Sequence, residues 1–186
     1  MENYIYSDYY WQDDKIRLRF SESKDADINI QIALDNQGLA MAHEKITLPP
    51  DINRSAENIK TENHSENPAF VIETLNGEFV GHTGFNYINE RDGTFAIGMF
   101  IIKEQRGNGY GYAAMRILLE YAFNERRLHK FDGWCLDDNL ASAKMMKKLG
   151  CKQEGIVREE AFLNGKYHNR LLFGMTENEY RRTHSK

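Results

Sequence analysis

The stretch from Gln105 to Gly111 (QRGNGYG) carries the residue types best suited to bind a ligand. Arg106 is followed by Gly107, Gly109 and Gly111 at alternate positions. Glycines leave backbone N–H groups uncovered by Cβ atoms, and the start of a following helix would add unpaired N–H groups and partial positive charge. With the arginine, this turn suits phosphate, although a tight strand-to-helix connection would use glycine too.

The segments on either side of this turn must position it. An unbroken apolar run, Phe95 to Ile102, precedes it, and Tyr112 to Phe123 follows with polar residues at helical intervals. Because the apolar run is hydrophobic on both faces, we expect it to be the central strand of a sheet that is covered on both sides. The sequence therefore predicts a buried strand, the glycine turn and a helix over 109–125.

The first third of the chain is less regular. Lys15–Ser21 alternates apolar and charged residues, which is typical of a strand with one buried face. A helical pattern begins near Ser23 and runs to about Lys45. A second, short and polar helix is predicted over 53–62, and the polar residues 61–67 read as a connector.

Two hairpins and one further strand–helix pair complete the pattern. The first hairpin joins 69–75 to 78–87, and its Asn76-Gly77 predicts a type I′ turn. A second turn at 89–93 leads into the central strand. We then expect an apolar strand over 131–136 and a helix over 139–149 that ends at Gly150. A last hairpin is predicted from about 151–162 and 166–175, with its turn at Asn164-Gly165, and a helical turn or two over 176–182 follows it.

Length and composition indicate one domain. The 186 residues are 41% hydrophobic, which suits a single compact unit over 1–186 with an N-terminal extension (1–12) and a C-terminal tail (176–186). The net charge of −4 gives no basic field for nucleic acid. No signal peptide and no membrane-spanning run are visible, so we expect no membrane partner.

The two cysteines, Cys135 and Cys151, form no CxxC pair, and no histidine–cysteine pattern accompanies them. We therefore expect no metal and a cytoplasmic protein.

The residues quoted so far resemble the GNAT superfamily of N-acetyltransferases. Arg106–Gly111 is similar to that family's R-x-x-G-x-G/A loop, which binds the pyrophosphate of acyl-coenzyme A. The resemblance runs from about residue 11 to the end, and the hairpin sequence Asn164-Gly165-Lys166-Tyr167 resembles the branch of ribosomal-protein N-terminal and polyamine acetyltransferases. The other matching segments are Trp11 with 16–19, 130–131, 138–139, Ala141, 148–151 and 154–155.

The resemblance implies a mixed α/β (α+β) fold. Its sheet would be mostly antiparallel, with about six to seven strands, about four helices and a V-shaped splay at the central strand. The co-substrate would be acetyl-CoA, and the acetyl group would pass directly to a primary amine without a nucleophilic cysteine. The resemblance also implies which residues contact the coenzyme. They are the backbone of Met99, Phe100, Ile101 and Ile102, and the loop residues Arg106, Gly107, Asn108, Gly109, Tyr110 and Gly111.

The catalytic groups are less determined. Asn139 would cap its helix and contact the pantetheine arm, but the family's usual tyrosine near the sulfur, seven residues later, is Met146, which has no proton to donate. Ser142 is a replacement acid or simply supports the cap. His82 and Glu73 are candidates for the general base, each with a structural role as the alternative.

Several alternatives remain open. His168 and the pair Glu159-Glu160 could face a cationic acceptor, or lie in solvent. Gly109-x-Gly111-x-x-Ala114 also fits a dinucleotide fingerprint, although hairpins precede it and no ribose-binding acid follows. A non-catalytic acyl-CoA-binding regulatory domain would explain Met146. The acceptor could be a polyamine, another small amine or a protein N-terminus, and strand-edge pairing of the last hairpin could form a homodimer.

Overall fold

The computed structural model describes residues 8–46, 48–49 and 67–184. The helix predicted over 53–62 and most of the polar connector therefore lie outside the described residues. One seven-stranded sheet forms the centre, in the order β1-β2-β3-β4-β5-β7-β6, and β4 and β5 are its parallel pair. The strands are β1 (Ile16–Arg19), β2 (Ala69–Thr74), β3 (Phe79–Asn89), β4 (Thr94–Ile101), β5 (Lys130–Leu136), β6 (Lys152–Leu163) and β7 (Lys166–Thr176). The predicted fold class is confirmed.

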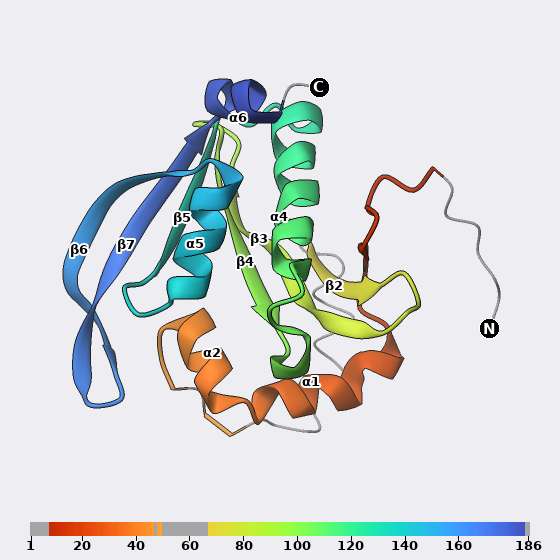
Figure 1. The fold of residues 1–186 in the computed structure, drawn as a ribbon, viewed down its shortest axis with the longest axis vertical. Coiled ribbons are helices and arrows are strands. Elements are labelled where there is room, and N and C mark those ends of the chain that lie inside the picture. The colour runs from red at the N-terminus through yellow and green to blue at the C-terminus, as the bar shows by residue number, and fades with distance from the viewer. Residues whose placement is uncertain (1–7, 47, 50–66, 185–186) are drawn as a thin grey trace.

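The sheet opens between β4 and β5. β4 is the fourth of seven strands, and it pairs with β3 along most of its length, from Thr94 to Ile101. Its described pairing with β5 is confined to Thr94↔Lys130 and Phe95↔Phe131. Because β5 instead follows β7 along its whole length, the two strands diverge beyond Phe95, as the predicted splay requires (Figure 1).

Two helices cover one face of this sheet (Figure 1). α4 (Tyr110–Glu120) continues into a π-helical turn over Tyr121–Glu125, and α5 (Leu140–Leu149) follows β5. A Cβ at Gly111 would lie 2.9 Å from the sulfur of Met99 on β4 and 3.5 Å from that of Met145 on α5. The absence of a side chain at Gly111 thus lets α4 approach the central strand closely.

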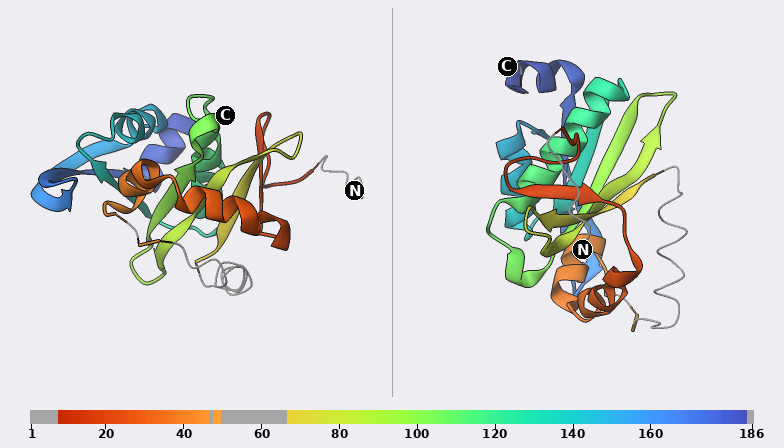
Figure 2. Two further views of the ribbon diagram at one scale, coloured as in Figure 1. Left: turned by 90° about the horizontal axis from the view of Figure 1, so that it is seen from below. Right: turned by 90° about the vertical axis from the view of Figure 1, so that its right-hand side faces the viewer.

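The helical pattern near the N-terminus is two helices, so the prediction of one continuous pattern to Lys45 is wrong. α1 (Ala26–Ala33) ends and α2 (Asn36–His43) begins around Asp35, whose side chain accepts a hydrogen bond from the Gly38 amide. An N-cap of this kind starts a new helix although the apolar spacing continues. Both helices run across the end of the sheet where β4 and β5 part (Figures 1 and 2).

The C-terminal segment is a docked helix, α6 (Glu177–His184). Tyr180 is buried, and its ring stacks on Phe123 in the π-helical turn with centroids 4.8 Å apart. The helical turn predicted over 176–182 is therefore confirmed, and it closes the end of the core opposite α1 and α2 (Figure 1).

The first hairpin does not have the predicted turn type. Only Gly77 has a positive φ there (83°), while Asn76 is not among the residues with positive φ, so a type I′ turn is wrong. The amide of Gly77 donates to the carbonyl of Thr74, and a bulge at Ile72/Glu73 shifts the register. At the last hairpin, both Asn164 (φ 52°) and Gly165 (φ 80°) are left-handed, as a type I′ turn demands.

The topology excludes the dinucleotide-binding alternative, because antiparallel strands precede β4 and the fingerprint opens no parallel sheet of successive strand–helix units. Within the described part of the chain, the helices are too short or too polar to cross a membrane.

Candidate active site

The glycine turn forms a cradle of exposed backbone at the start of α4. A short 3-10 turn over Lys103–Gln105 leads from β4 to Arg106, and Gly107 and Gly109 both have φ of 84°. This left-handed conformation favours glycine, which has no Cβ to clash. A Cβ at Gly107 would meet no described atom within 4 Å, so the loop is open, and the N-cap position of α4 is Gly109, which has no side chain to occupy the first amides. The cradle can therefore accept an anion.

Arg106 connects this cradle to two other elements. Its Nε donates to the carbonyl oxygen of Ile101 at 2.9 Å, and its Nη2 lies 2.6 Å from Oδ2 of Asp35. The guanidinium also lies over the Phe100 ring, 5.5 Å from the centroid. One side chain thus links the loop, the end of β4 and the start of α2.

Asp35 uses its two carboxylate oxygens differently. Oδ1 accepts from the Gly38 amide at 2.9 Å, and Oδ2 pairs with Arg106. Partial burial would raise the pKa of Asp35, but the Gly38 amide and the Arg106 guanidinium outweigh it, so the pKa is lowered. Gly38 makes the contact possible, since a Cβ there would lie 2.3 Å from Nη2 of Arg106 and 2.4 Å from Oδ2 of Asp35.

The end of β4 offers backbone groups to the opening. The Ile102 amide donates to the Val80 carbonyl on β3 at 3.0 Å and is therefore occupied. Hydrogen-bonding groups of successive strand residues face opposite sides, so those of Phe100 also face β3, while those of Met99 and Ile101 face β5. Of the four predicted contact residues, Met99 and Ile101 have backbone groups directed into the opening, and the Ile101 carbonyl oxygen also accepts from Nε of Arg106.

The other wall of the opening carries Asn139 and Ser142. Asn139 caps α5, with its Oδ1 accepting from the Ser142 amide at 3.2 Å. The half-buried Ser142 also hydrogen-bonds the buried thiol of Cys135 on β5. Burial raises the pKa of Cys135, and the Ser142 bond only partly opposes this. The hydroxyl and the thiol are thus neighbours at the point where β5 ends.

Met146 lies deeper than these polar groups. It is buried, and its sulfur would be 3.1 Å from a Cβ at Gly133 on β5. The side chain belongs to the main hydrophobic core. Its proposed contact with the coenzyme stays a prediction, and its packing on β5 accounts for the residue type.

The two candidate bases lie together on the β1–β3 side of the sheet. His82 is paired with Phe100 on β4 and its ring meets that of Phe79, with centroids 5.1 Å apart. Burial lowers the pKa of His82, with Asp25 and Arg19 acting in opposite directions. A lowered pKa leaves the ring neutral at neutral pH, which is the form that a base requires.

Glu73 is held in an ion cluster. Its Oε1 is 3.2 Å from Arg17 and its Oε2 is 2.6 Å from Arg19, which also binds the buried Asp25 at 2.8 Å. Both oxygens are therefore engaged, and this favours the structural alternative that the sequence left open. His82 and Glu73 lie around the same arginine, on the opposite side of β4 from Asn139 and Ser142.

The last hairpin is tied to α2 by charges that sequence reasoning missed. Arg170 on β7 pairs with Glu44, which follows α2, and with Glu160 on β6 at 2.5 Å. The pair Glu159-Glu160 is thus split: Glu160 is bound to Arg170, while the Glu159 amide bonds the Asn169 side chain. No local signal identifies these partners, because the contacts join distant parts of the chain.

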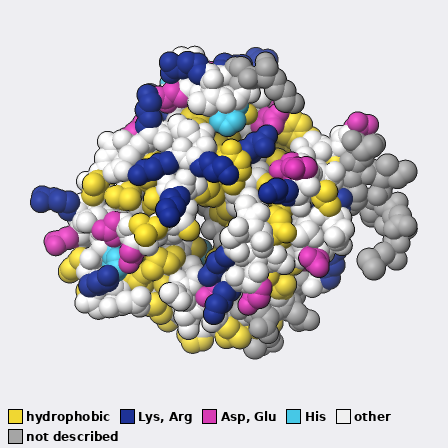
Figure 3. Space-filling model, in the orientation of Figure 1, with side chains coloured by type: hydrophobic (Ala, Val, Ile, Leu, Met, Phe, Trp, Pro, Cys, Tyr) yellow, Lys and Arg dark blue, Asp and Glu magenta, His cyan; other side chains and the backbone are white. Residues whose placement is uncertain are grey.

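Cations gather on the α4–α5 face although the net charge of the chain is −4 (Figure 3). Exposed basic residues there are Arg116, Lys144, Lys147 and Lys148, and the Lys148 ammonium lies 4.4 Å above the Tyr112 ring. A groove of about 680 Å³ begins at Tyr112 and runs along α4 to α6. The groove starts at the residue that follows the cradle, and its lining includes no residue of β4 or β5.

Fold and site together define an α/β protein with an anion cradle beside an opening in its central sheet. The chain belongs to the GNAT acetyltransferase family, because the family described as "Acetyltransferase (GNAT) domain" matches residues 15–152. That family uses acetyl-CoA, and the resemblance seen in the sequence is confirmed. The protein is accordingly an acyltransferase of the N-acetyltransferase class.

Relatives include an uncharacterized N-acetyltransferase, p20, of Bacillus licheniformis, which is 24% identical over 172 residues, covering 90% of this chain and 96% of p20. The spermidine N(1)-acetyltransferase of Escherichia coli (strain K12) is 27% identical over 115 residues, covering 62% and 61% of the two chains. Among solved structures, a Vibrio cholerae spermidine N-acetyltransferase in complex with CoA and spermine has a TM-score of 0.80 at 20% identity, covering 90% of this chain and 99% of that one.

A ribosomal-protein alpha-N-acetyltransferase, RimL, in complex with coenzyme A has a TM-score of 0.75 at 19% identity, covering 88% and 95% of the chains. At these identities the two structures show a shared fold. The relatives that match in sequence include a spermidine N(1)-acetyltransferase and a protein named "Putative ribosomal N-acetyltransferase YdaF", in agreement with the branch that the hairpin sequence indicated.

Proposed function

We propose that this protein transfers an acetyl group from acetyl-CoA to the primary amine of a small molecule, such as a polyamine, or of a protein N-terminus. The observation that carries the proposal is the placement of the glycine cradle beside the β4–β5 opening. A ligand with a pyrophosphate and an extended amide-containing arm would match both features at once. The cradle would hold the pyrophosphate, and the opening would receive the arm.

The binding roles follow from the backbone. The amides from Gly107 to Gly111 would bind phosphate oxygens, assisted by the guanidinium of Arg106. Backbone groups of Met99 and Ile101 would bond the pantetheine amides, and one N–H would polarise the thioester carbonyl. Asn139 would contact the arm from the α5 side. The basic α4–α5 face adds attraction for the phosphates, since its lysines lie close to α4.

The chemical step needs a base for the amine and a proton source for the thiolate. An ordinary amine, with a pKa near about 10, is mostly protonated at neutral pH. His82 can accept that proton, directly or through water, because it is held neutral by burial. The hydroxyl of Ser142 is the candidate donor to the leaving sulfur, since it lies at the end of β5 with Asn139.

The acceptor would enter between α1–α2 and the last hairpin. The Arg170 contacts with Glu44 and Glu160 join these elements at that side of the opening. A spermidine acetyltransferase among the relatives favours an amine acceptor for this chain too.

Two further proposals concern the setting of the protein. Its two cysteines are buried and unpaired, which suits the reducing cytoplasm.

β6 is an edge strand with exposed Ile156, Val157 and Phe162, so pairing of this edge with a second copy would give a homodimer. Light scattering coupled to size-exclusion chromatography tests the dimer, and a mass equal to one chain at high concentration contradicts it.

Coenzyme A release from acetyl-CoA, measured with a panel of amines, tests the activity. The panel should contain spermidine, spermine, an aminoglycoside and a short peptide with a free N-terminus. Turnover on at least one amine, accompanied by a mass gain of one acetyl group, is expected. Tight coenzyme binding without turnover on any amine would identify a non-catalytic binding domain instead.

A further inference from the structure

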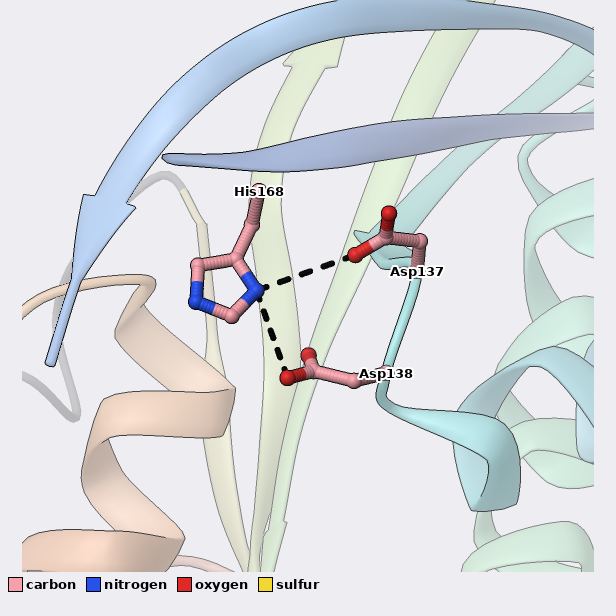
Figure 4. A group of neighbouring side chains, drawn as sticks. All are labelled: Asp137, Asp138 and His168. Carbon is pink, nitrogen blue, oxygen red and sulfur yellow. Dashed lines mark ion pairs between the residues drawn. The ribbon is translucent and has the colours of Figure 1, made fainter. Parts of the chain in front are cut away.

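Three metal-ligating side chains converge at the end of β5, outside the machinery assigned above. Asp137 and Asp138 lie in the turn that follows β5, and His168 comes from β7. Nδ1 of His168 is 3.2 Å from Oδ2 of Asp138 and 3.7 Å from Oδ1 of Asp137 (Figure 4). The three ligand atoms lie within 4.8 Å of one another.

The imidazole of His168 has an incomplete set of partners. Its side chain is only 3% exposed, and its Nε2 lies 3.2 Å from the carbonyl oxygen of Leu163. A carbonyl only accepts, so Nε2 must carry the hydrogen. In the neutral ring, Nδ1 then presents a lone pair to two carboxylates, which also only accept. A buried lone pair facing two anions calls for a cation between them, and the two candidates are a proton on Nδ1 and a metal ion.

The separations fit a metal ion as that cation. Ligand atoms about 2.0–2.1 Å from a tetrahedral Zn²⁺ stand about 3.3–3.4 Å apart. The two distances from Nδ1, 3.2 and 3.7 Å, bracket this value. One imidazole nitrogen with two carboxylate oxygens is a ligand set that Zn²⁺ accepts, with the fourth position open to water. Asp137 and Asp138 are about two-fifths exposed, so an ion can enter from solvent.

A supporting contact orients the ligands. Nδ2 of Asn169 donates to Oδ2 of Asp137 at 2.8 Å, which leaves Oδ1 directed at the imidazole. The Asn169 carbonyl also accepts from the Asp137 amide, at 3.0 Å. Such outer partners are typical of metal sites. Lys166 is the competing cation, but its ammonium is 3.9 Å from Asp138 and the side chain is two-thirds exposed, so it can move aside.

We propose that Asp137, Asp138 and His168 bind one divalent transition-metal ion, Zn²⁺ by ligand preference. The ion would fasten the turn between β5 and α5 to β7. This proposal departs from the expectation, drawn from the sequence, that the protein binds no metal. That expectation rested on the lack of a cysteine–histidine pattern, and the ligands proposed here include no cysteine. The site is independent of the proposed acetyl transfer, and its test needs no activity measurement.

Isothermal titration of the untagged, EDTA-treated full chain with ZnCl₂ tests the site, with MgCl₂ as a second titrant. We expect one equivalent of Zn²⁺ and far weaker binding of Mg²⁺. Asp138→Asn should weaken Zn²⁺ binding by at least about tenfold, and the same change at exposed Asp92, in the turn before β4, should leave it intact. Binding of CoCl₂ should give the visible absorption of tetrahedral Co²⁺.

His168→Gln should abolish Zn²⁺ binding, but this side chain is buried, so its replacement can also impair folding. Asp138 is exposed, and Asp138→Asn is therefore the variant that perturbs folding least. Equal Zn²⁺ affinity of the wild type and Asp138→Asn would overturn the proposal. So would nitrogen NMR showing His168 protonated at both ring nitrogens in excess Zn²⁺, because the proton would then be the cation.

Discussion

Nη2 of Arg106 lies 2.6 Å from Oδ2 of Asp35, so the loop assigned to the coenzyme phosphates is joined to the N-terminus of α2. A bound pyrophosphate and Asp35 would both attract the same guanidinium. The two contacts can coexist only if Arg106 divides its donors between them, and it has five. The proposed coenzyme side and the proposed acceptor side of the opening would therefore share one residue.

Replacing Arg106 with alanine should weaken acetyl-CoA binding by about 10- to 100-fold, because a hydrogen bond to a charged group contributes about 1.5–3 kcal/mol. Titration calorimetry with coenzyme A measures the change. Lys103→Ala is the control, since this cation precedes the same loop but is assigned no contact with the ligand. An unchanged affinity of Arg106→Ala would remove the guanidinium from the binding site.

Gly38→Ala should destabilise the protein by about 1–3 kcal/mol, the usual cost of overpacking. A Cβ would lie 2.3 Å from Arg106 and force the guanidinium away from Asp35. Alanine also favours a helix by about 1 kcal/mol relative to glycine, so the cost of the steric clash exceeds the net loss by about that amount. Urea denaturation is the assay, and Gly155→Ala is the matched control because its Cβ would meet Leu172 at an ordinary 3.7 Å. A stabilised Gly38→Ala variant would contradict the tight contact.

Ser142→Ala should lower kcat by about 10²- to 10⁴-fold if the hydroxyl protonates the leaving sulfur, with little change in KM for acetyl-CoA. The helix cap is retained, since it uses the Ser142 amide rather than the side chain. Ser142→Thr, which keeps a hydroxyl, should recover much of the rate. If both variants turn over like the wild type, Ser142 has no part in the chemistry.

Glu73→Gln should cost about 3–5 kcal/mol of stability, the range for breaking a buried ion pair, because Arg17 and Arg19 lose their shared carboxylate. Below the melting transition its kcat should remain near that of the wild type. Thermal unfolding followed by circular dichroism gives the first quantity and coenzyme A release the second. A large loss of kcat with normal stability would instead make Glu73 the base.

The lowered pKa of His82 predicts a pH-dependent stability. Between its folded pKa and the ordinary value of about 6.5, the unfolded state binds more protons, so stability rises with pH. The contribution is complete above about pH 6.5 and is lost as the pH falls through the folded pKa. Urea midpoints from pH 7 to 5 should fall less steeply in His82→Gln than in the wild type. His129→Gln, at an exposed position, should keep the wild-type slope.

Local patterns predicted the elements of this fold well. The apolar run before Gln105 and the glycines after it carry their signal in consecutive residues, so β4, the cradle and α4 were found. The break between α1 and α2 was missed because Ile28, Ile32 and Leu39 keep a helical spacing across Asp35, whose capping bond to Gly38 decides the boundary. The predicted turn type at Asn76-Gly77 was wrong because Thr74 pairs with Glu78, which leaves a loop of three residues rather than two.

The glycine loop and the helix cap of the candidate site were predictable from local sequence, whereas the partners of its charged side chains were not. The pairing of Arg106 with Asp35, of Arg170 with Glu44 and of His168 with two aspartates joins residues far apart in sequence. Nothing local in the sequence specifies the partner of any of these charges. The sequence also does not show which polar side chains are buried. Burial lowers the pKa of His82, and Glu73 is held by an ion pair with Arg19.

The narrow junction at Thr94–Lys130 and Phe95–Phe131 has a thermodynamic consequence. Past it, the halves β1–β4 and β5–β7–β6 share no ladder in the described sheet, so part of the cohesion of the folded chain is left for a ligand to supply. A ligand that binds only the folded state at a hundred times its Kd adds about 2.7 kcal/mol of stability. If acetyl-CoA is that ligand, the coenzyme-free chain would be the less stable form, and the abundance of this protein in a cell would follow the supply of acetyl-CoA.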